Sequence, residues 1–250
     1  MIEYLKSIYR SLRRKLKFFW SVNWIKTYYF NYKKFPYSIA KKLPVFFYGS
    51  VKLSSIRGNI KIDYPIKKAM IGFGQPYEWN KKSNRTAELI LNGEFVFKGH
   101  VQFGKDYFIF IDSNAYCEFG HLSSLGSRGK LMCKEKIILG KFARIGSESQ
   151  LIDTNFHQMI NTVTGEKYKM TSPILIGNYN YIGNRVSIMQ NTVTPNNCTI
   201  ASNTLSNKDY TSLGENILIG GIPAKLLKEN ISRDWDGEQK MLEEHLIVFK

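Results

Sequence analysis

One aliphatic residue recurs at every sixth position through much of the second half of this sequence. The clearest block spans residues 176–205, and its leading residues are Ile176, Ile182, Ile188, Thr194 and Ile200. A second block has the leading residues Leu139, Ile145 and Leu151. A fixed period of this kind is the signature of a repeat architecture. An interval of six matches neither the period of a helix nor the alternation of a plain strand.

A six-residue period fits a short strand and a bend repeated at equal intervals, with one aliphatic side chain pointing inward each time. Three such sides make a triangular coil, and neighbouring coils pair as parallel strands. Glycines follow the leading aliphatics at positions that suit bends with unusual backbone angles; they are Gly140, Gly146, Gly177 and Gly183. The sequence therefore predicts a mainly β protein built on a left-handed parallel β-helix.

Three segments are expected along the chain. Residues 1–44 form a basic, aromatic-rich segment that is partly helical. Residues 45–222 form a β-rich lead-in and the β-helix, with a loop extruded near residues 152–175, where the hexads stop. Residues 223–250 form a helical tail, in which Pro223 opens a short helix and a second helix lies near Trp235 to Leu246.

The positive charge of the chain is concentrated near its N-terminus. The formal net charge is +16, and residues 1–70 contribute +14 of it, because 16 Lys and Arg face only Glu3 and Asp63. Apolar residues from Tyr4 to Phe19 recur there at helical spacing. A basic helix with an aromatic-rich apolar face can lie on an anionic membrane surface. Packing on the main domain or on another subunit is the alternative interpretation.

Further sequence features indicate a cytoplasmic protein, with peripheral attachment at the inner face of the membrane as an open alternative. The apolar run at residues 18–25 is interrupted by Ser21 and Asn23, and it falls short of the roughly 20 residues of a membrane span. No signal-peptide pattern follows the basic start. The cysteines are odd in number and widely spaced, which argues against disulfides and zinc; they are Cys117, Cys133 and Cys198.

Two stretches of the sequence resemble the hexapeptide-repeat acetyltransferases. They are IGNYNYIGNRVSIMQNTVTPNNCTIASNTLSNKD, from Ile176, and GGIPAKLLK, from Gly220 to Lys228. The likeness covers roughly residues 97–230 and is closest to O-acetyltransferases that modify sugars and surface polysaccharides. It implies acetyl-CoA as co-substrate, a sugar or polysaccharide acceptor, and a homotrimer with active sites between subunits. It also implies that His157 stands where the coil meets the extruded loop.

The chemistry of such a transfer gives His157 a role. A sugar hydroxyl is a poor nucleophile, so transfer from a thioester needs a base, and an imidazole titrates near neutral pH. His157 is therefore the candidate general base, in a direct transfer without an acetyl-enzyme. Cys133 and Cys198 have no neighbouring His and are expected to line the coil interior.

The resemblance also implies supporting residues. Asn155 stands where relatives often have an acid, and Asp153 either faces the acceptor or caps a turn. Tyr181 is expected to pack against the pantetheine or the acceptor. The acetyl-CoA site is expected to include Gly183, Asn184, Ala201, Ser202, Lys208, Lys225 and Lys228.

Several alternatives stay open on the sequence alone. The same base and donor site would serve an N-acetyltransferase acting on an amino or nucleotide sugar. A non-catalytic β-helix that acts as a scaffold or binds an anionic polymer is the alternative from another class. A metal-dependent enzyme of this fold needs three clustered histidines, and no third histidine completes a set with His121 and His157, so no metal is expected. Nucleic-acid binding ranks lowest, because no recognised module accompanies the basic segment.

Overall fold

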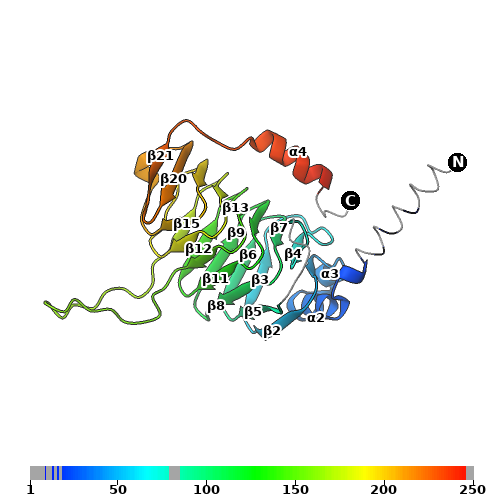
Figure 1. The fold of residues 1–250 in the computed structure, drawn as a ribbon. Coiled ribbons are helices and arrows are strands. Elements are labelled where there is room, and N and C mark those ends of the chain that lie inside the picture. The colour runs from blue at the N-terminus through cyan, green and yellow to red at the C-terminus, as the bar shows by residue number, and fades with distance from the viewer. Residues whose placement is uncertain (1–8, 10–12, 14–15, 17–18, 79–84, 246–250) are drawn as a thin grey trace.

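The computed structural model describes residues 9, 13, 16, 19–78 and 85–245. Three sheets form the body of the protein (Figure 1), and they hold nine, seven and five strands. The first sheet contains β1 (Val45–Phe47), β4 (Ile71–Phe73), β7 (Val101–Phe103), β10 (Ser123–Leu125), β13 (Arg144–Ile145), β16 (Tyr181–Ile182), β18 (Cys198–Ile200), β20 (Ile217–Gly221) and β21 (Ala224–Lys228). The second contains β2 (Val51–Ile56), β5 (Ala87–Leu91), β8 (Phe108–Ile111), β11 (Lys130–Cys133), β14 (Gln150–Ile152), β17 (Ser187–Met189) and β19 (Leu205–Ser206). The third contains β3 (Asn59–Ile62), β6 (Glu94–Phe97), β9 (Tyr116–Phe119), β12 (Lys136–Leu139) and β15 (Ile174–Ile176).

The chain visits the first, second and third sheets in turn, so that each round makes one coil. Every strand pairs in parallel with the matching strand of the next coil, apart from the antiparallel pair β20–β21. Inward side chains stack along the axis, from the parallel rings of Phe73 and Phe103 at 4.4 Å to the buried Ile182 and Ile200. The predicted fold class, a left-handed parallel β-helix, is confirmed.

The β-helix begins at β1, much earlier than the hexads indicate. The pairs β1–β4 and β2–β5 already have the parallel register of later coils. β4 ends at Phe73 and β5 begins only at Ala87, a longer interval than separates the corresponding strands of later coils, and the register shifts between Leu53 and Ser55. These irregular lengths hide the six-residue period, so the expected lead-in is in fact the first part of the β-helix.

The hexad glycines have a different role from the one expected. Gly140, Gly146, Gly177 and Gly183 do not have positive φ; that angle falls two positions later, as at Phe142 (57°) after Gly140. A Cβ on Gly140 would instead lie 2.7 Å from the backbone nitrogen of Asn178 in the next coil. These glycines are required because consecutive coils approach closely at the corners.

Helix α2 (Trp24–Lys34) and the short α3 (Tyr37–Ala40) cover the N-terminal end of the β-helix (Figure 1). The side-chain amide of Asn31 bonds to both backbone groups of Val45: its Nδ2 donates to the Val45 carbonyl at 2.7 Å, and its Oδ1 accepts from the Val45 N–H. Phe30 packs edge-on against Phe47 at 5.1 Å. The apolar residues from Tyr4 to Phe19 that predict an earlier helix lie mostly outside the described residues.

The C-terminal tail differs from the expectation in its first part. Residues after Pro223 form strand β21, which pairs antiparallel with β20, where a helix is predicted. The turn at Gly221 has a φ of 106°, and it directs the chain back along β20 rather than into a helix. The second predicted helix is present as α4 (Trp235–His245). A 3-10 turn, η1 (Thr211–Leu213), precedes β20.

In the part of the chain that the structure describes, no helix combines the length and the apolar character that crossing a bilayer requires.

Candidate active site

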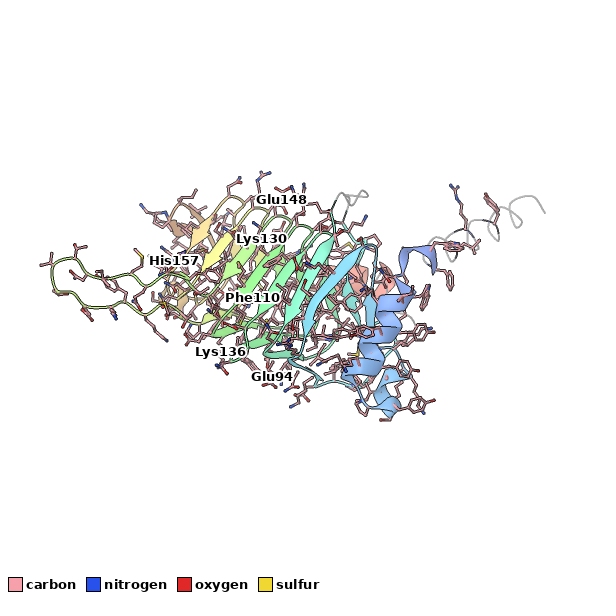
Figure 2. All side chains as sticks on the ribbon, turned by 90° about the horizontal axis from the view of Figure 1, so that it is seen from below. Glu94, Phe110, Lys130, Lys136, Glu148 and His157 are labelled. Carbon is pink, nitrogen blue, oxygen red and sulfur yellow. The ribbon has the colours of Figure 1, made fainter. Side chains whose placement is uncertain are left out.

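An extended arm leaves the β-helix between β14 and β15 (Figures 1 and 2). We call residues 153–173 the arm. Its two halves run antiparallel, with bridges between Thr154 and Thr171 and between Ile160 and Lys167. The arm emerges at the corner between the second and third sheets, and the β-helix resumes at β15 in the register of the third sheet. The predicted extrusion near residues 152–175 is therefore present.

Asp153 anchors the root of the arm. Its side chain is fully buried, and its carboxylate accepts hydrogen bonds from the backbone N–H groups of Lys134, Glu135 and Lys136 at 2.7, 2.8 and 2.8 Å. Both oxygens are thereby engaged with the corner of the preceding coil. Of the two roles predicted for Asp153, the structure supports the capping one.

The returning half of the arm is held by Glu135. Its carboxylate accepts from the Thr171 hydroxyl at 2.6 Å and pairs with the Lys169 ammonium at 3.1 Å. These interactions lower the pKa of the Glu135 carboxyl, chiefly through the Thr171 hydrogen bond. Glu135 is a supporting residue that the sequence analysis missed, because it lies in an ordinary surface-like run of charges, KEK.

His157 lies where the arm leaves the body (Figure 2) and is exposed. The chain bends at Phe156, which has a positive φ of 60°, and the Asn155 N–H donates to the carbonyl of Met170 across the arm. Within the described residues, no hydrogen bond or ion pair holds the imidazole. His157 is therefore accessible to a substrate, and the described part of one copy provides its imidazole with no orienting group.

Four of the residues predicted for the acetyl-CoA site come together at another corner. Gly183, Asn184, Ala201 and Ser202 lie between the first and second sheets. The Asn184 N–H donates to Ser202 Oγ at 3.1 Å, and Asn184 Oδ1 accepts from the Ser147 N–H at 2.9 Å. A Cβ on Gly183 would lie 2.7 Å from Ser202 Oγ. These side chains are used for stacking one coil on the next, so they leave mainly the exposed edge of the corner for a ligand.

The predicted cations are divided between two places. Lys208 is exposed at the corner between the second and third sheets, the same corner as His157 and two coils further along. Lys225 and Lys228 are exposed on β21, at the C-terminal end of the β-helix. Tyr181 belongs to the first sheet, and the Arg233 guanidinium lies 4.7 Å from its ring centroid. Tyr181 therefore does not share the corner of His157.

The first sheet is covered by segments of its own chain. The Tyr77 hydroxyl donates to the carbonyl of Leu125 at 3.1 Å. The Glu78 carboxylate accepts from the Ser127 N–H at 2.7 Å and from the Ser147 hydroxyl at 2.9 Å. No matching segment among the described residues covers the second sheet.

The second sheet presents an apolar row on its outer face, which the sequence analysis missed. The register aligns one outward side chain from each of five successive strands, and all five are only half-buried: Ile90, Phe110, Met132, Ile152 and Met189. Phe110 marks this row in Figure 2. The signal was available in runs such as FIFI, where both alternate positions are apolar. The second sheet is bordered by the Gly183 corner on one side and the His157 corner on the other.

The remaining histidines and cysteines lie elsewhere. His100 and His121 occupy the corner between the third and first sheets, where His121 stacks on Tyr64 at 5.0 Å. Cys133 and Cys198 line the interior as predicted, and burial raises the pKa of the Cys198 thiol to about 12. Over the described ranges, no three His, Cys, Asp or Glu side chains converge as they would to hold a metal ion.

Comparisons with known proteins give likenesses of structure only. No family model matches the sequence, and no curated protein matches it. One similar solved structure is the polySia specific acetyltransferase NeuO, with a TM-score of 0.48 and 17% identity over 76% of this chain and 78% of that chain. Another is the polysialic acid O-acetyltransferase OatWY, with a TM-score of 0.46 and 20% identity over 74% of this chain and 91% of that chain. A third is AntD, an N-acyltransferase from Bacillus cereus in complex with dTDP and 3-hydroxybutyryl-CoA. Its TM-score is 0.38, with 14% identity over 84% of this chain and 97% of that chain. At these scores the likenesses assign neither a family nor an activity to this chain.

Proposed function

We propose that this protein is an acetyl-CoA-dependent O-acetyltransferase that acts on a sugar hydroxyl of a surface or capsular polysaccharide or its precursor. The observation that carries the proposal is the position of His157, exposed at the root of an arm that interrupts a regular β-helix. The hexads and the GGIPAKLLK segment support it through their resemblance to the hexapeptide-repeat acetyltransferases.

The proposed reaction needs one base and no covalent enzyme intermediate. The His157 imidazole accepts the proton of the sugar hydroxyl while that oxygen attacks the thioester carbonyl. The C–S bond breaks, an ester C–O bond forms, and the proton passes from the imidazolium to the CoA thiolate. The tetrahedral intermediate needs fixed donors for its oxyanion, and backbone N–H groups at the coil corners are suited to that role.

We propose that the active site is completed by a second copy of the chain within a homotrimer. His157 and the Gly183 corner lie on opposite borders of the second sheet, so a single copy does not bring them together. The apolar row on that sheet suits a subunit interface, whose core is richer in apolar side chains than the rim. Packing of a neighbour on this face would place its Gly183 corner beside His157.

Acetyl-CoA fits the charges available along this surface. Its phosphates would contact Lys208, which lies at the same corner as His157, and Lys225 and Lys228, which lie at the C-terminal end of the β-helix. All three are exposed cations, and Lys binds phosphate as a point charge. Acceptors of different chemistry, a hydroxyl or an amine, would use the same base.

The first test is acetyl transfer by the purified full chain. Acetyl-CoA is incubated with a panel of hydroxyl and amino sugars, and both thiol release and the acetylated product are measured. We expect ester products, and we expect His157→Ala to reduce turnover by about 100- to 10,000-fold while acetyl-CoA binding by calorimetry stays unchanged. The matched control is Lys167→Ala, an exposed substitution further out on the same arm.

Three outcomes would contradict the proposal. Full turnover by His157→Ala would show that His157 is not the general base. Amide products alone would favour the N-acetyltransferase alternative. If the folded chain does not bind acetyl-CoA, the donor site is excluded and the non-catalytic scaffold remains as the alternative.

A further inference from the structure

A continuous row of aromatic rings crosses the exposed side of the N-terminal cap. Successive ring centroids lie 5.1 to 6.3 Å apart from Phe19 through Trp24, Tyr28 and Tyr32 to Tyr37. Trp20 extends the row through Phe19 at 5.8 Å, and it is 79% exposed. We call these six residues the aromatic row. Ile25, at 81% exposure, and Tyr29, at 52%, widen it on the surface of α2.

Most of the aromatic row takes no part in the packing that attaches α2 to the β-helix; the exception is the half-buried Trp24, which packs edge-on against Phe46 of β1 at 5.6 Å. That packing uses the buried residues Thr27, Phe30 and Asn31 on another side of the helix. Large apolar side chains gathered on one exposed surface mark an interaction site more often than chance exposure. The row lies at the N-terminal end of the β-helix, away from the arm (Figures 1 and 2).

Positive charge surrounds the aromatic row without any acidic residue beside it in sequence. Glu3 and Asp63 bound a stretch that contains no Asp or Glu. Five lysines lie on α2 or directly after α3: Lys33, Lys41 and Lys42 are exposed, Lys26 is half-buried, and the half-buried Lys34 donates to the carbonyls of Ile56 and Gly58. The Lys41 ammonium lies 5.8 Å from the Tyr37 ring centroid. The cap therefore combines exposed rings with cations of one sign.

We propose that α2 and α3 form a docking surface for a bilayer that contains anionic lipids. Tyr and Trp rings are favoured at the headgroup level, and lysines keep their charge in water while their stems cover apolar surface. Each lysine near an anionic leaflet adds to binding. Charge complementarity favours the bilayer over a second copy of the chain, whose cap would carry the same positive charge. This proposal does not depend on the acyl-transfer chemistry.

The test is co-sedimentation of the full chain with vesicles, one set of phosphatidylcholine alone and one with phosphatidylserine added. We expect binding to the anionic vesicles that falls steeply with salt, and little binding to the neutral ones. Replacing Lys26, Lys33, Lys41 and Lys42 by Gln should weaken binding by at least tenfold, since each lysine near the surface is worth about fivefold. Replacing Tyr28, Tyr32 and Tyr37 by Ser should weaken it at unchanged net charge.

Two matched controls separate the docking surface from general charge and exposure. The first replaces four exposed lysines elsewhere by Gln: Lys130, Lys136, Lys167 and Lys240. The second is Tyr168→Ser, on the arm. Both controls should bind anionic vesicles as the unchanged chain does.

Equal weakening by the charge-matched control would overturn the proposal, and so would unchanged binding by the cap variants. Self-association that is abolished by the Tyr variant, with no vesicle binding, would assign the cap to a second copy. Salt-dependent binding to nucleic acid without vesicle binding would assign it to that polymer instead.

Discussion

At the residue scale, Asp153 shows how the chain can branch out of a regular coil. The arm interrupts the β-helix between β14 and β15. The backbone N–H groups at the corner of the preceding coil, between β11 and β12, therefore lose the partners that a continuing coil would supply. The Asp153 carboxylate takes their place with three hydrogen bonds. Hydrogen bonds to a charged acceptor are worth more than those between neutral groups.

We predict that Asp153→Asn destabilises the fold. The amide keeps one acceptor oxygen but places NH₂ donors against backbone donors, so we expect the free energy of unfolding to fall by about 2 to 3 kcal/mol. Urea denaturation measures this. The control is Asp63→Asn, an exposed partner of Lys98, which should leave stability nearly unchanged because exposed ion pairs contribute little. Lost turnover with unchanged stability would instead give Asp153 a chemical role.

His100 adds a pH-dependent element to stability. It is buried beside His121 and Tyr64, and burial, followed by the charges of His121 and Lys67, lowers the pKa of its imidazole to about 4. The folded protein therefore holds this side chain neutral. The unfolded chain takes up a proton near the usual value of 6.5, and the folded chain does so only near 4.

We predict that stability falls as the pH drops from about 6.5 to about 4, because the unfolded state binds the proton first. Thermal unfolding midpoints across this range provide the measurement. His100→Gln should make the pH dependence shallower, whereas His157→Gln, at an exposed position, is the matched control. An identical slope in His100→Gln would show that other groups cause the dependence.

At the element scale, α2 closes the end of a stack in which no coil precedes β1 within the described residues. Sheet edges left open invite pairing with other chains, and α2 covers β1 with a side-chain network in place of a strand. Phe30 is the apolar centre of that contact, fully buried against Phe47.

We predict that Phe30→Ala lowers the free energy of unfolding by about 3 to 5 kcal/mol, as expected for truncation of a buried aromatic ring. The neighbouring Tyr29→Ala, on the exposed side of the same helix, should stay within about 0.5 kcal/mol. Denaturant unfolding of both variants makes the comparison. Similar small effects for both would mean that α2 is not part of the cooperative fold.

The same scale shows which elements the sequence could predict. The coils after Ile176 obey a strict six-residue period because their corners are tight, so their strands were predictable. The coils before Phe97 have longer corners, and their period is lost even though the pairing is the same. The sequence predicts a helix where β21 lies, because Pro223 suits a helix start. The pairing of β21 with β20 decides its structure, and sequence spacing does not contain that information.

At the scale of the whole molecule, the candidate site was only partly predictable. His157 could be found because a repeat stops there. The separation of Gly183 and His157 onto two corners depends on which sheet each strand joins, and that follows from three-dimensional winding. The apolar row on the second sheet was hidden for the same reason, since its members come from five strands far apart in sequence.

We predict that this row holds copies of the chain together. Met132→Glu should convert a trimer to monomers in analytical ultracentrifugation, because an unpaired carboxylate is costly to bury. Ile138→Glu provides the matched control, since Ile138 is an outward, half-buried residue of the third sheet. Dissociation by the control alone would move the interface to the third sheet.

The stacking of the coils also fixes a length. Four coil steps separate β1, beneath the N-terminal cap, from β13, in the coil that carries the arm. Neighbouring parallel strands are spaced by about 4.8 Å, so these steps amount to about 20 Å of stiff, hydrogen-bonded structure. With the cap resting on a bilayer, the β-helix acts as a spacer. In that arrangement it would set the height of His157 above the lipid headgroups, at a distance that suits the proposed reaction on a sugar chain carried by the membrane.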